Sequence, residues 1–285
     1  MAHTCLKGNV RLPALGIVFL IALSSGVKGR AQPFPQQQFP LVSPYCGTLL
    51  SWFRVMNRNP AALAHFRDTI AGQRRAFFAV QPSRFGLSAL NRLTAGILLP
   101  ALLEGLPMSI IVHGTGGAKF TDLQTALSVG YAGLPSFFIG GRLAVRYQRF
   151  GSLRTWLDGS WSTAVLFVID TIWSLAATVQ NFPHFHRAPA SMAMYEATTS
   201  LRWHQPEASM EVGLLLRSFA APSAYGLFET AAIGVPFRIG YQLFPATAEF
   251  SIAVPAGSAI AEMVVSYQPI LGIVVEVAVE YVWAQ

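Results

Sequence analysis

Long apolar runs, interrupted by isolated polar residues, fill the chain from Leu87 onward. The clearest run extends from Trp161 to Gln180 and contains one charged residue, Asp170. Because a helix needs about 17–25 apolar residues to cross a bilayer, this run predicts a membrane-spanning helix. Further apolar runs occupy residues 87–112, 218–237 and 250–275. The pattern therefore predicts a mainly α fold, a helical integral membrane bundle with about four spanning or re-entrant segments.

The composition supports a membrane protein. Hydrophobic residues make up 53% of the chain and charged residues 12%, with a mean hydropathy of +0.44. A soluble domain carries about 25% charged residues, so much of this surface is expected to face something other than water. The composition argues against a third interpretation, an exported protein that is soluble after cleavage.

The charge is unevenly distributed. Residues 1–160 hold 16 Lys and Arg against 4 Asp and Glu, a net charge of +12, and residues 161–285 hold 4 against 9, a net charge of −5. The basic residues are scattered among apolar runs, which favours contact with anionic lipid over binding to nucleic acid. We therefore expect membrane lipid as a partner and no nucleic acid.

Three segments are predicted along the chain. Residues 1–31 combine a basic start with a short apolar centre, which is typical of a signal peptide or a signal-anchor. Residues 32–85 form a Pro/Gln-rich linker followed by a basic interfacial segment. Residues 86–285 form the membrane domain. The chain is accordingly placed in a membrane, with an N-terminal signal or anchor.

Three of the apolar runs each contain an acidic residue: Asp170, Glu229 and Glu262. A charge at the centre of a bilayer is unfavourable by at least about 2.5–3.5 kcal/mol, so such residues usually face a polar interior. Two interpretations are open: the three carboxylates share one polar site, or each lies near a helix end or is paired locally.

A histidine-containing stretch lies between Phe182 and Glu207. It includes His184, His186 and His204, and it ends in the segment TTSLRWHQPE. The pieces HFHRAPAS and TTSLRWHQPE, in this order, resemble motifs of the fatty acid hydroxylase/sterol desaturase superfamily. Weaker similarities extend the resemblance over roughly residues 84–250.

This resemblance implies a helical membrane enzyme. Members of the superfamily hold two iron ions with a cluster of histidines, and they use O2 and a redox partner to hydroxylate or desaturate a lipid. Most of the required histidines are absent here: Pro189 and Ala190 replace two of them, and no histidine follows His204. The implied residual ligands are His184, His186 and His204, with Asp170 as an outer group that orients a ligand. Three ligands suffice for one metal ion such as zinc.

The sequence thus predicts an oxygen-dependent diiron lipid hydroxylase or desaturase that is impaired or inactive because its active site is degenerate. Whether the chain is an enzyme stays open. The alternative is a non-catalytic membrane protein, either a structural subunit or a lipid-binding remnant of the fold. Arg202 and Glu207 are candidates for an ion pair within the histidine stretch.

Overall fold

The computed structural model describes residues 58–65, 73–82, 91–103, 106–117, 120–151, 154–182, 194–205, 207–217, 220–232, 235–269 and 272–284. The chain divides into two units, Met1–Gln36 and Gln37–Gln285. All the described residues belong to the second unit. The predicted signal or anchor at residues 1–31 and the Pro/Gln-rich part of the linker lie outside the described residues.

The second unit is built almost entirely from β-strands. One short helix, α3 (Ala61–His65), precedes them. The strands are β1 (Gln73–Gln81), β2 (Arg92–Leu103), β3 (Leu106–Gly117), β4 (Phe120–Leu134), β5 (Phe137–Phe150), β6 (Arg154–Val168), β7 (Trp173–Phe182), β8 (Met194–His204), β9 (Ala208–Arg217), β10 (Ser223–Ala232), β11 (Val235–Gln242), β12 (Thr247–Ala256), β13 (Ala259–Gln268) and β14 (Gly272–Ala284).

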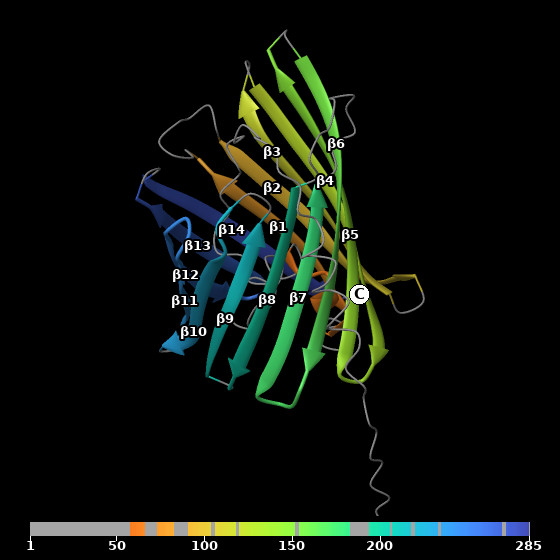
Figure 1. Ribbon diagram of the computed structural model, residues 1–285, viewed down its shortest axis with the longest axis vertical. Coiled ribbons are helices and arrows are strands. Elements are labelled where there is room, and N and C mark those ends of the chain that lie inside the picture. Colours follow the sequence, from red (N-terminus) through yellow and green to blue (C-terminus); the bar gives the residue numbers. More distant parts are fainter. Residues whose placement is uncertain are drawn as a thin grey trace, which may run out of the picture. The chain divides into compact units, whose positions relative to one another are not determined.

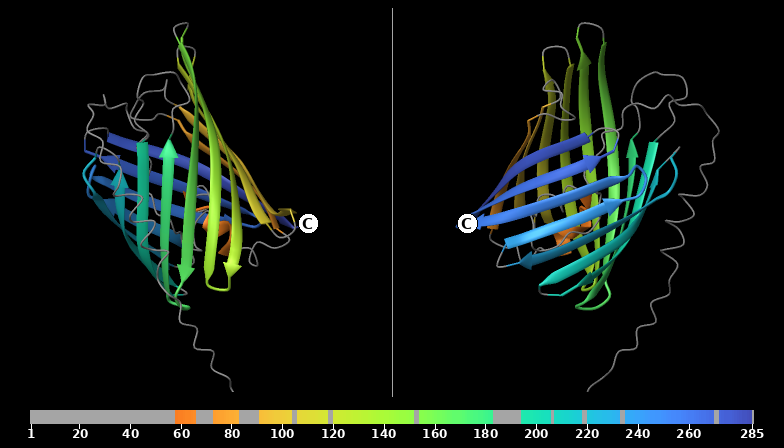
Figure 2. Two further views of the ribbon diagram at one scale, coloured as in Figure 1. Left: turned by 45° about the vertical axis from the view of Figure 1, so that its right-hand side comes forward. Right: turned by 90° about the vertical axis from the view of Figure 1, so that its left-hand side faces the viewer.

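The fourteen strands form a closed barrel (Figure 1). Each strand pairs antiparallel with its neighbours in sequence, and β1 pairs with β14 to close the ring, from Gln73 opposite Ala284 to Val80 opposite Val277. Closure supplies a hydrogen-bonded neighbour to every strand and leaves no free edge. Strands β4, β5 and β6 are the longest on one side of the barrel, and the β3–β4 and β5–β6 hairpins extend past the other strands at one end (Figure 2).

The predicted helical bundle is wrong, because each apolar run folds as strands. The run 87–112 supplies β2 and the first part of β3, and the run 250–275 covers parts of β12, β13 and β14. No helix in the described part of the chain is long and apolar enough to cross a membrane.

The run that most resembled a spanning helix shows the reason. Trp161–Gln180 folds as the end of β6, a turn and most of β7, and Asp170 lies in that turn. The Asp170 carboxylate accepts hydrogen bonds from the backbone N–H groups of Ile172 and Trp173, each at 2.7 Å. A short acceptor of this kind stabilises a turn, so the acidic residue divides the run into two strands.

The side chains alternate between two environments along each strand. Because successive residues of a strand point to opposite faces, one set faces the barrel interior and the other faces outward. The outward set is apolar, as in β5, where Leu143 and Val145 are exposed while Ala144 between them is buried. Outward aromatic residues lie towards both ends of the strands, with Tyr147, Tyr241 and Tyr267 near one end and Tyr131, Trp173 and Tyr281 near the other.

Helix α3 packs against the inner face of β4, β5 and β6. Asn59 begins the helix, since its side-chain oxygen accepts a hydrogen bond from the Ala61 N–H at 3.0 Å. Two glycines that face each other across β4 and β5, Gly130 and Gly140, make the close approach possible. A Cβ atom on Gly140 would lie 2.1 Å from the backbone carbon of Pro60. The helix therefore occupies part of the interior against this wall.

An apolar cluster holds the helix in place. Ala61 and Ala64 pack with residues from three strands, namely Phe138 on β5, Ala164 and Leu166 on β6, and Ala176 on β7. His65 contacts the Phe138 ring edge-on, with ring centroids 4.9 Å apart. Buried apolar contact of this kind is what fixes a five-residue helix that would not be stable alone.

Candidate functional site

The interior of the barrel is polar, and its charged residues are deeply buried. On β10, Tyr225 and Glu229 face inward and are 5% and 0% exposed, whereas Phe228 faces outward and is 41% exposed. A soluble barrel would have the opposite distribution, with apolar residues inside. This inner face gathers ionisable side chains from many strands and is therefore the candidate functional site.

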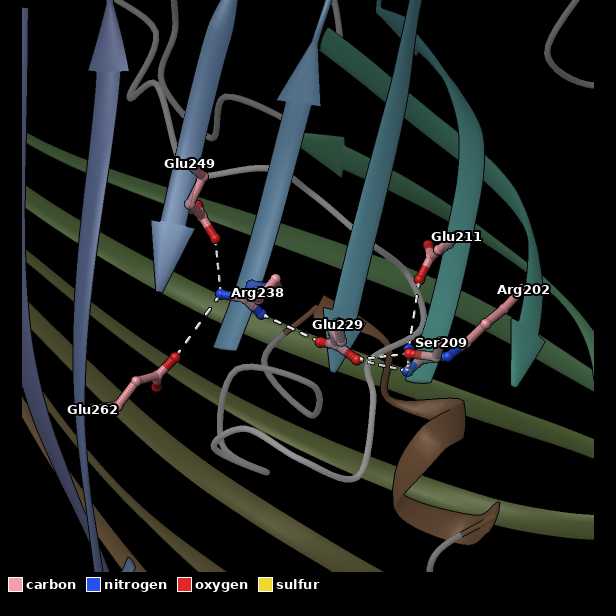
Figure 3. Close-up of polar contacts among 7 residues, drawn as sticks. All are labelled: Arg202, Ser209, Glu211, Glu229, Arg238, Glu249 and Glu262. Carbon is pink, nitrogen blue, oxygen red and sulfur yellow. Dashed lines mark hydrogen bonds and ion pairs between the residues drawn. The ribbon is translucent and has the colours of Figure 1, made fainter. Parts of the chain in front are cut away.

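A continuous chain of ion pairs and hydrogen bonds crosses the inner face of β8 to β13 (Figure 3). We call it the interior charge belt. It consists of Arg202, Ser209, Glu211, Tyr225, Glu229, Arg238, Glu249 and Glu262. All eight side chains belong to residues that are at most 5% exposed.

The first half of the belt is centred on Arg202 of β8. Its Nη2 donates to Glu229 Oε2 at 2.6 Å, and its Nη1 lies 3.8 Å from Glu211 Oε2. Ser209 Oγ donates to the same Glu229 oxygen at 3.1 Å. The strand register produces this arrangement, because Arg202 is the cross-strand partner of Glu211, and Ser209 is that of Glu229.

The second half is centred on Arg238 of β11. Its Nη2 donates to Glu249 Oε1 at 2.7 Å and lies 3.9 Å from Glu262 Oε1. Its Nη1 lies 3.9 Å from Glu229 Oε1, so Glu229 joins the two halves. Figure 3 shows Arg238 between these three carboxylates, which come from three different strands.

Tyr225 completes the belt with the help of a glycine. The tyrosine hydroxyl donates to Glu211 Oε1 at 3.0 Å. Gly213 is the cross-strand partner of Tyr225, and a Cβ atom on Gly213 would lie 2.4 Å from the ring carbon Cζ. The missing side chain at Gly213 therefore lets the tyrosine ring lie across the inner wall of β9 and reach the carboxylate.

Other polar pairs line the rest of the inner wall. On β1 and β14, Arg75 donates to Glu280 at 2.9 Å. On β4 and β5, Arg146 donates twice to Asp122, at 2.8 and 2.6 Å, a two-point geometry that strengthens an ion pair. The interior is thus ionic over both halves of the barrel, and the belt links six charged residues from six adjacent strands.

The residues predicted from sequence lie elsewhere or outside the described structure. Asp170 is in the exposed turn between β6 and β7, where it caps backbone N–H groups. His204 ends β8, and its backbone N–H donates to the Ile172 carbonyl at 2.7 Å. His184 and His186 lie outside the described residues. Within the described ranges, no three His, Cys, Asp or Glu side chains are grouped to hold a metal ion, and the three-histidine site stays a prediction.

The acidic residues were a better signal than the histidines. Glu229 and Glu262 both lie 3.9 Å from Arg238, so two of the three acids singled out in the apolar runs share one polar site. Asp170 is not part of it. Arg202 was identified as a partner of Glu207, but its guanidinium faces inward to Glu229 and Glu211. Sequence analysis missed Glu211 and Glu249, because neither interrupts an apolar run of helical length.

A closed barrel with an apolar outer face and a charged interior defines the class: this is an integral membrane β-barrel, in contact with membrane lipid. No family model matches the chain, and no curated protein matches it. Among solved structures, the Ralstonia pickettii toluene transporter TbuX superimposes with a TM-score of 0.55 over 81% of this chain and 93% of that chain, at 8% identity. A KdgM porin superimposes less well, with a TM-score of 0.42 over 73% of this chain and 98% of that chain at 9% identity. So does a mutant of the Rh. blastica porin, with a TM-score of 0.41 over 74% of this chain and 99% of that chain at 9% identity.

The expected resemblance to fatty acid hydroxylases and sterol desaturases is therefore wrong. In the segment TTSLRWHQPE, on which it rested most, residues 198–204 form the second half of β8. Short matches of this kind occur by chance, and the other matching piece, HFHRAPAS, lies outside the described residues. The predicted diiron hydroxylase or desaturase is overturned with the fold, and nothing in the described structure points to a redox partner. The alternative, a non-catalytic membrane protein, agrees better with a barrel.

Proposed function

We propose that this chain is an outer-membrane β-barrel that passes small solutes across the membrane through its interior. The observation that carries the proposal is the inverted distribution of side chains, with apolar residues on the outside and ionised residues within. Charged side chains inside a spanning structure usually mark a pathway for solutes or ions.

The connections between strands support an outer-membrane orientation. At one end of the barrel they contain two to four residues, and both Gln73 of β1 and Ala284 of β14 lie at that end. At the other end, the connections after β1 and β7 span residues 82–91 and 183–193, and the remaining five contain two to five residues. Outer-membrane barrels have an even number of strands, short periplasmic turns and longer external loops, so we place the longer connections outside.

The depth of burial favours restricted passage over a wide open channel. The belt residues are at most 5% exposed, and helix α3 occupies the inner face of β4 to β6. Side chains that are this inaccessible do not line an open passage for water or solutes. Passage therefore requires a rearrangement inside the barrel, which is the behaviour of a gated or selective transporter. The fold itself does not set the solute.

Conductance measurements on purified protein in planar lipid bilayers test the proposal. We expect discrete current steps of low amplitude for the wild-type protein and larger or longer steps for Gly140→Ala, in which the added methyl group displaces helix α3. Gly141→Ala is the matched control, since nothing lies within 4 Å of its added Cβ atom. Absence of conductance and of solute uptake into liposomes for all three proteins would refute the proposal and favour a purely structural membrane protein.

A further inference from the structure

The turns between β4 and β5 and between β6 and β7 form one surface at the barrel end where β1 begins and β14 ends. The Val168 N–H at the end of β6 donates to the carbonyl oxygen of Ser136 in the β4–β5 turn at 2.9 Å. Within the β6–β7 turn, the Ile169 N–H donates to the Trp173 carbonyl oxygen at 3.0 Å. Backbone hydrogen bonds therefore fix the two turns relative to each other.

Three large apolar side chains of these turns are exposed: Leu134 is 64%, Ile169 53% and Ile172 40% exposed. We call these three residues the apolar turn patch. Outward aromatic residues lie next to the patch, with Tyr131 on β4 59% exposed and Trp173 on β7 39% exposed. Tyrosine and tryptophan are enriched at the membrane–water interface. The patch lies beyond them along the chain, at turn positions where polar or small residues are usual.

Two other turns at this end of the barrel carry polar or small residues. The described residues of the β8–β9 turn include exposed Gln205 and Glu207, and the β12–β13 turn consists of exposed Gly257 and Ser258. Among the turns that the structure describes at this end, exposed large apolar residues are therefore gathered on the β4–β7 side. This one-sided distribution indicates an apolar contact outside the barrel on that side.

We propose that the apolar turn patch is inserted into the adjoining lipid leaflet, at the boundary between the headgroups and the acyl chains. The patch is continuous with the lipid-facing surface of the barrel. Leu134 pairs across the strands with Phe137, and Phe137 pairs with outward Phe167, which is 41% exposed. Apolar surface that inserts at this boundary is typically buried by about 5–10 Å. The inference requires a barrel in a bilayer and is independent of solute passage.

Lipid fits this patch better than a protein partner does. Residues 131–139 and 165–173, which carry the patch and the neighbouring strand ends, contain one charged residue, Asp170. Its Oδ1 accepts hydrogen bonds from the backbone N–H groups of Ile172 and Trp173, so this charge serves the turn itself. The patch therefore offers mostly apolar surface, and the removal of such surface from water requires no directional partner.

Labelling of single cysteines measures whether water reaches the patch. Leu134→Cys and Ile169→Cys are each introduced in a chain with Cys5 and Cys46 replaced by serine. The proteins are reconstituted in lipid nanodiscs, whose two faces are open to a water-soluble maleimide. Ser258→Cys in the β12–β13 turn is the matched control, since Ser258 is exposed at the same end of the barrel. We expect both patch cysteines to react about tenfold more slowly than the control, which corresponds to about 1.4 kcal/mol of protection.

Quenching by brominated phospholipid identifies what covers the patch. A fluorophore attached to each cysteine should be quenched at positions 134 and 169, and not at position 258, when the bromine is carried near the headgroup end of the acyl chains. Equal labelling rates for all three cysteines would overturn the inference, because the patch would then lie in water. Slow labelling without quenching would also overturn it, because a protein partner or a second copy of the chain would then cover the patch.

Discussion

Replacing Gly140 with alanine should release helix α3 from the barrel wall. The added Cβ atom would lie 2.1 Å from the Pro60 carbonyl carbon and 2.2 Å from the Ala61 nitrogen. Ordinary contacts between such atoms are about 3.5–4.0 Å, so the helix backbone would have to move by more than an ångström. The strand belongs to a closed barrel and cannot yield, so the helix has to leave the wall.

The free energy of docking follows from the apolar surface that the docked helix buries. Three alanine methyl groups and Leu63 are removed from water, at about 0.8 kcal/mol per methyl-sized group and about 1.5–3 kcal/mol for the leucine. Docking therefore stabilises the helix on the wall by up to about 4–5 kcal/mol. Since each 1.4 kcal/mol is a factor of ten, the docked helix should shield a residue at position 63 from solvent by about 10³-fold.

Thiol labelling measures this protection. Leu63→Cys, in a chain with Cys5 and Cys46 replaced by serine, should react slowly with a water-soluble maleimide in the wild-type background. In the Gly140→Ala background the reaction should accelerate by up to about 10³-fold. Gly141→Ala is the control, because its Cβ atom meets nothing within 4 Å. Equal labelling rates in the two alanine backgrounds would refute the proposed docking of α3 on the glycine pair.

Three further predictions concern the interior. Gly213→Ala should push the Tyr225 ring away and break its hydrogen bond to Glu211, which should lower the free energy of unfolding in a urea titration by about 1–3 kcal/mol. Gly226→Ala is the control and should leave that free energy unchanged, because its Cβ atom meets nothing within 4 Å. Arg202→Met should lower the free energy of unfolding by about 3–5 kcal/mol, because it leaves carboxylates buried without their partner. The temperature at which the folded band disappears on gels measures this loss. Adding Glu229→Gln should recover part of it. Burial lowers the pKa of His65 from 6.5 to about 4. The contribution of neutral His65 to stability is therefore complete above pH 6.5 and is lost as the pH falls from 6.5 towards 4. His65→Gln should flatten the dependence of the unfolding temperature on pH in this range, and an unchanged pH profile in the variant would contradict this prediction.

The difference between helix and strand was hard to detect because the inward residues of this barrel are often small and uncharged. Along β6, for example, Ser162, Ala164 and Leu166 face inward between outward Trp161 and Val165. An apolar–polar alternation is weak when many of the inward positions hold alanine, glycine or serine, and the signal of a spanning strand is much weaker than that of a spanning helix. Hydropathy averaged over a window therefore merged two strands and a turn into one apparent helix.

The candidate site was also only partly predictable from the sequence. Unusual acids in apolar surroundings, Glu229 and Glu262, were recognisable as residues in need of a polar partner, and the structure places both beside Arg238. The partner itself was not recognisable. Arg238 approaches Glu249 and Glu262 because β11, β12 and β13 are adjacent in the sheet and in a particular register, and register depends on pairings that a single strand does not specify.

The amino-acid sequence by itself determined that this protein belongs in a membrane, because a chain with 12% charged residues cannot cover its surface with polar groups. It also determined which carboxylates had to find partners, since the penalty for burying a charge is a property of the residue and its apolar neighbours. Only the tertiary structure decided between a helical bundle and a barrel. A helix satisfies its backbone within one segment, whereas a membrane strand needs a neighbour, and here the final neighbours, β1 and β14, join Gln73 to Ala284 across almost the whole described chain. The closure of that ring is what turns the polar side of every strand inward and brings the four glutamates of the belt together.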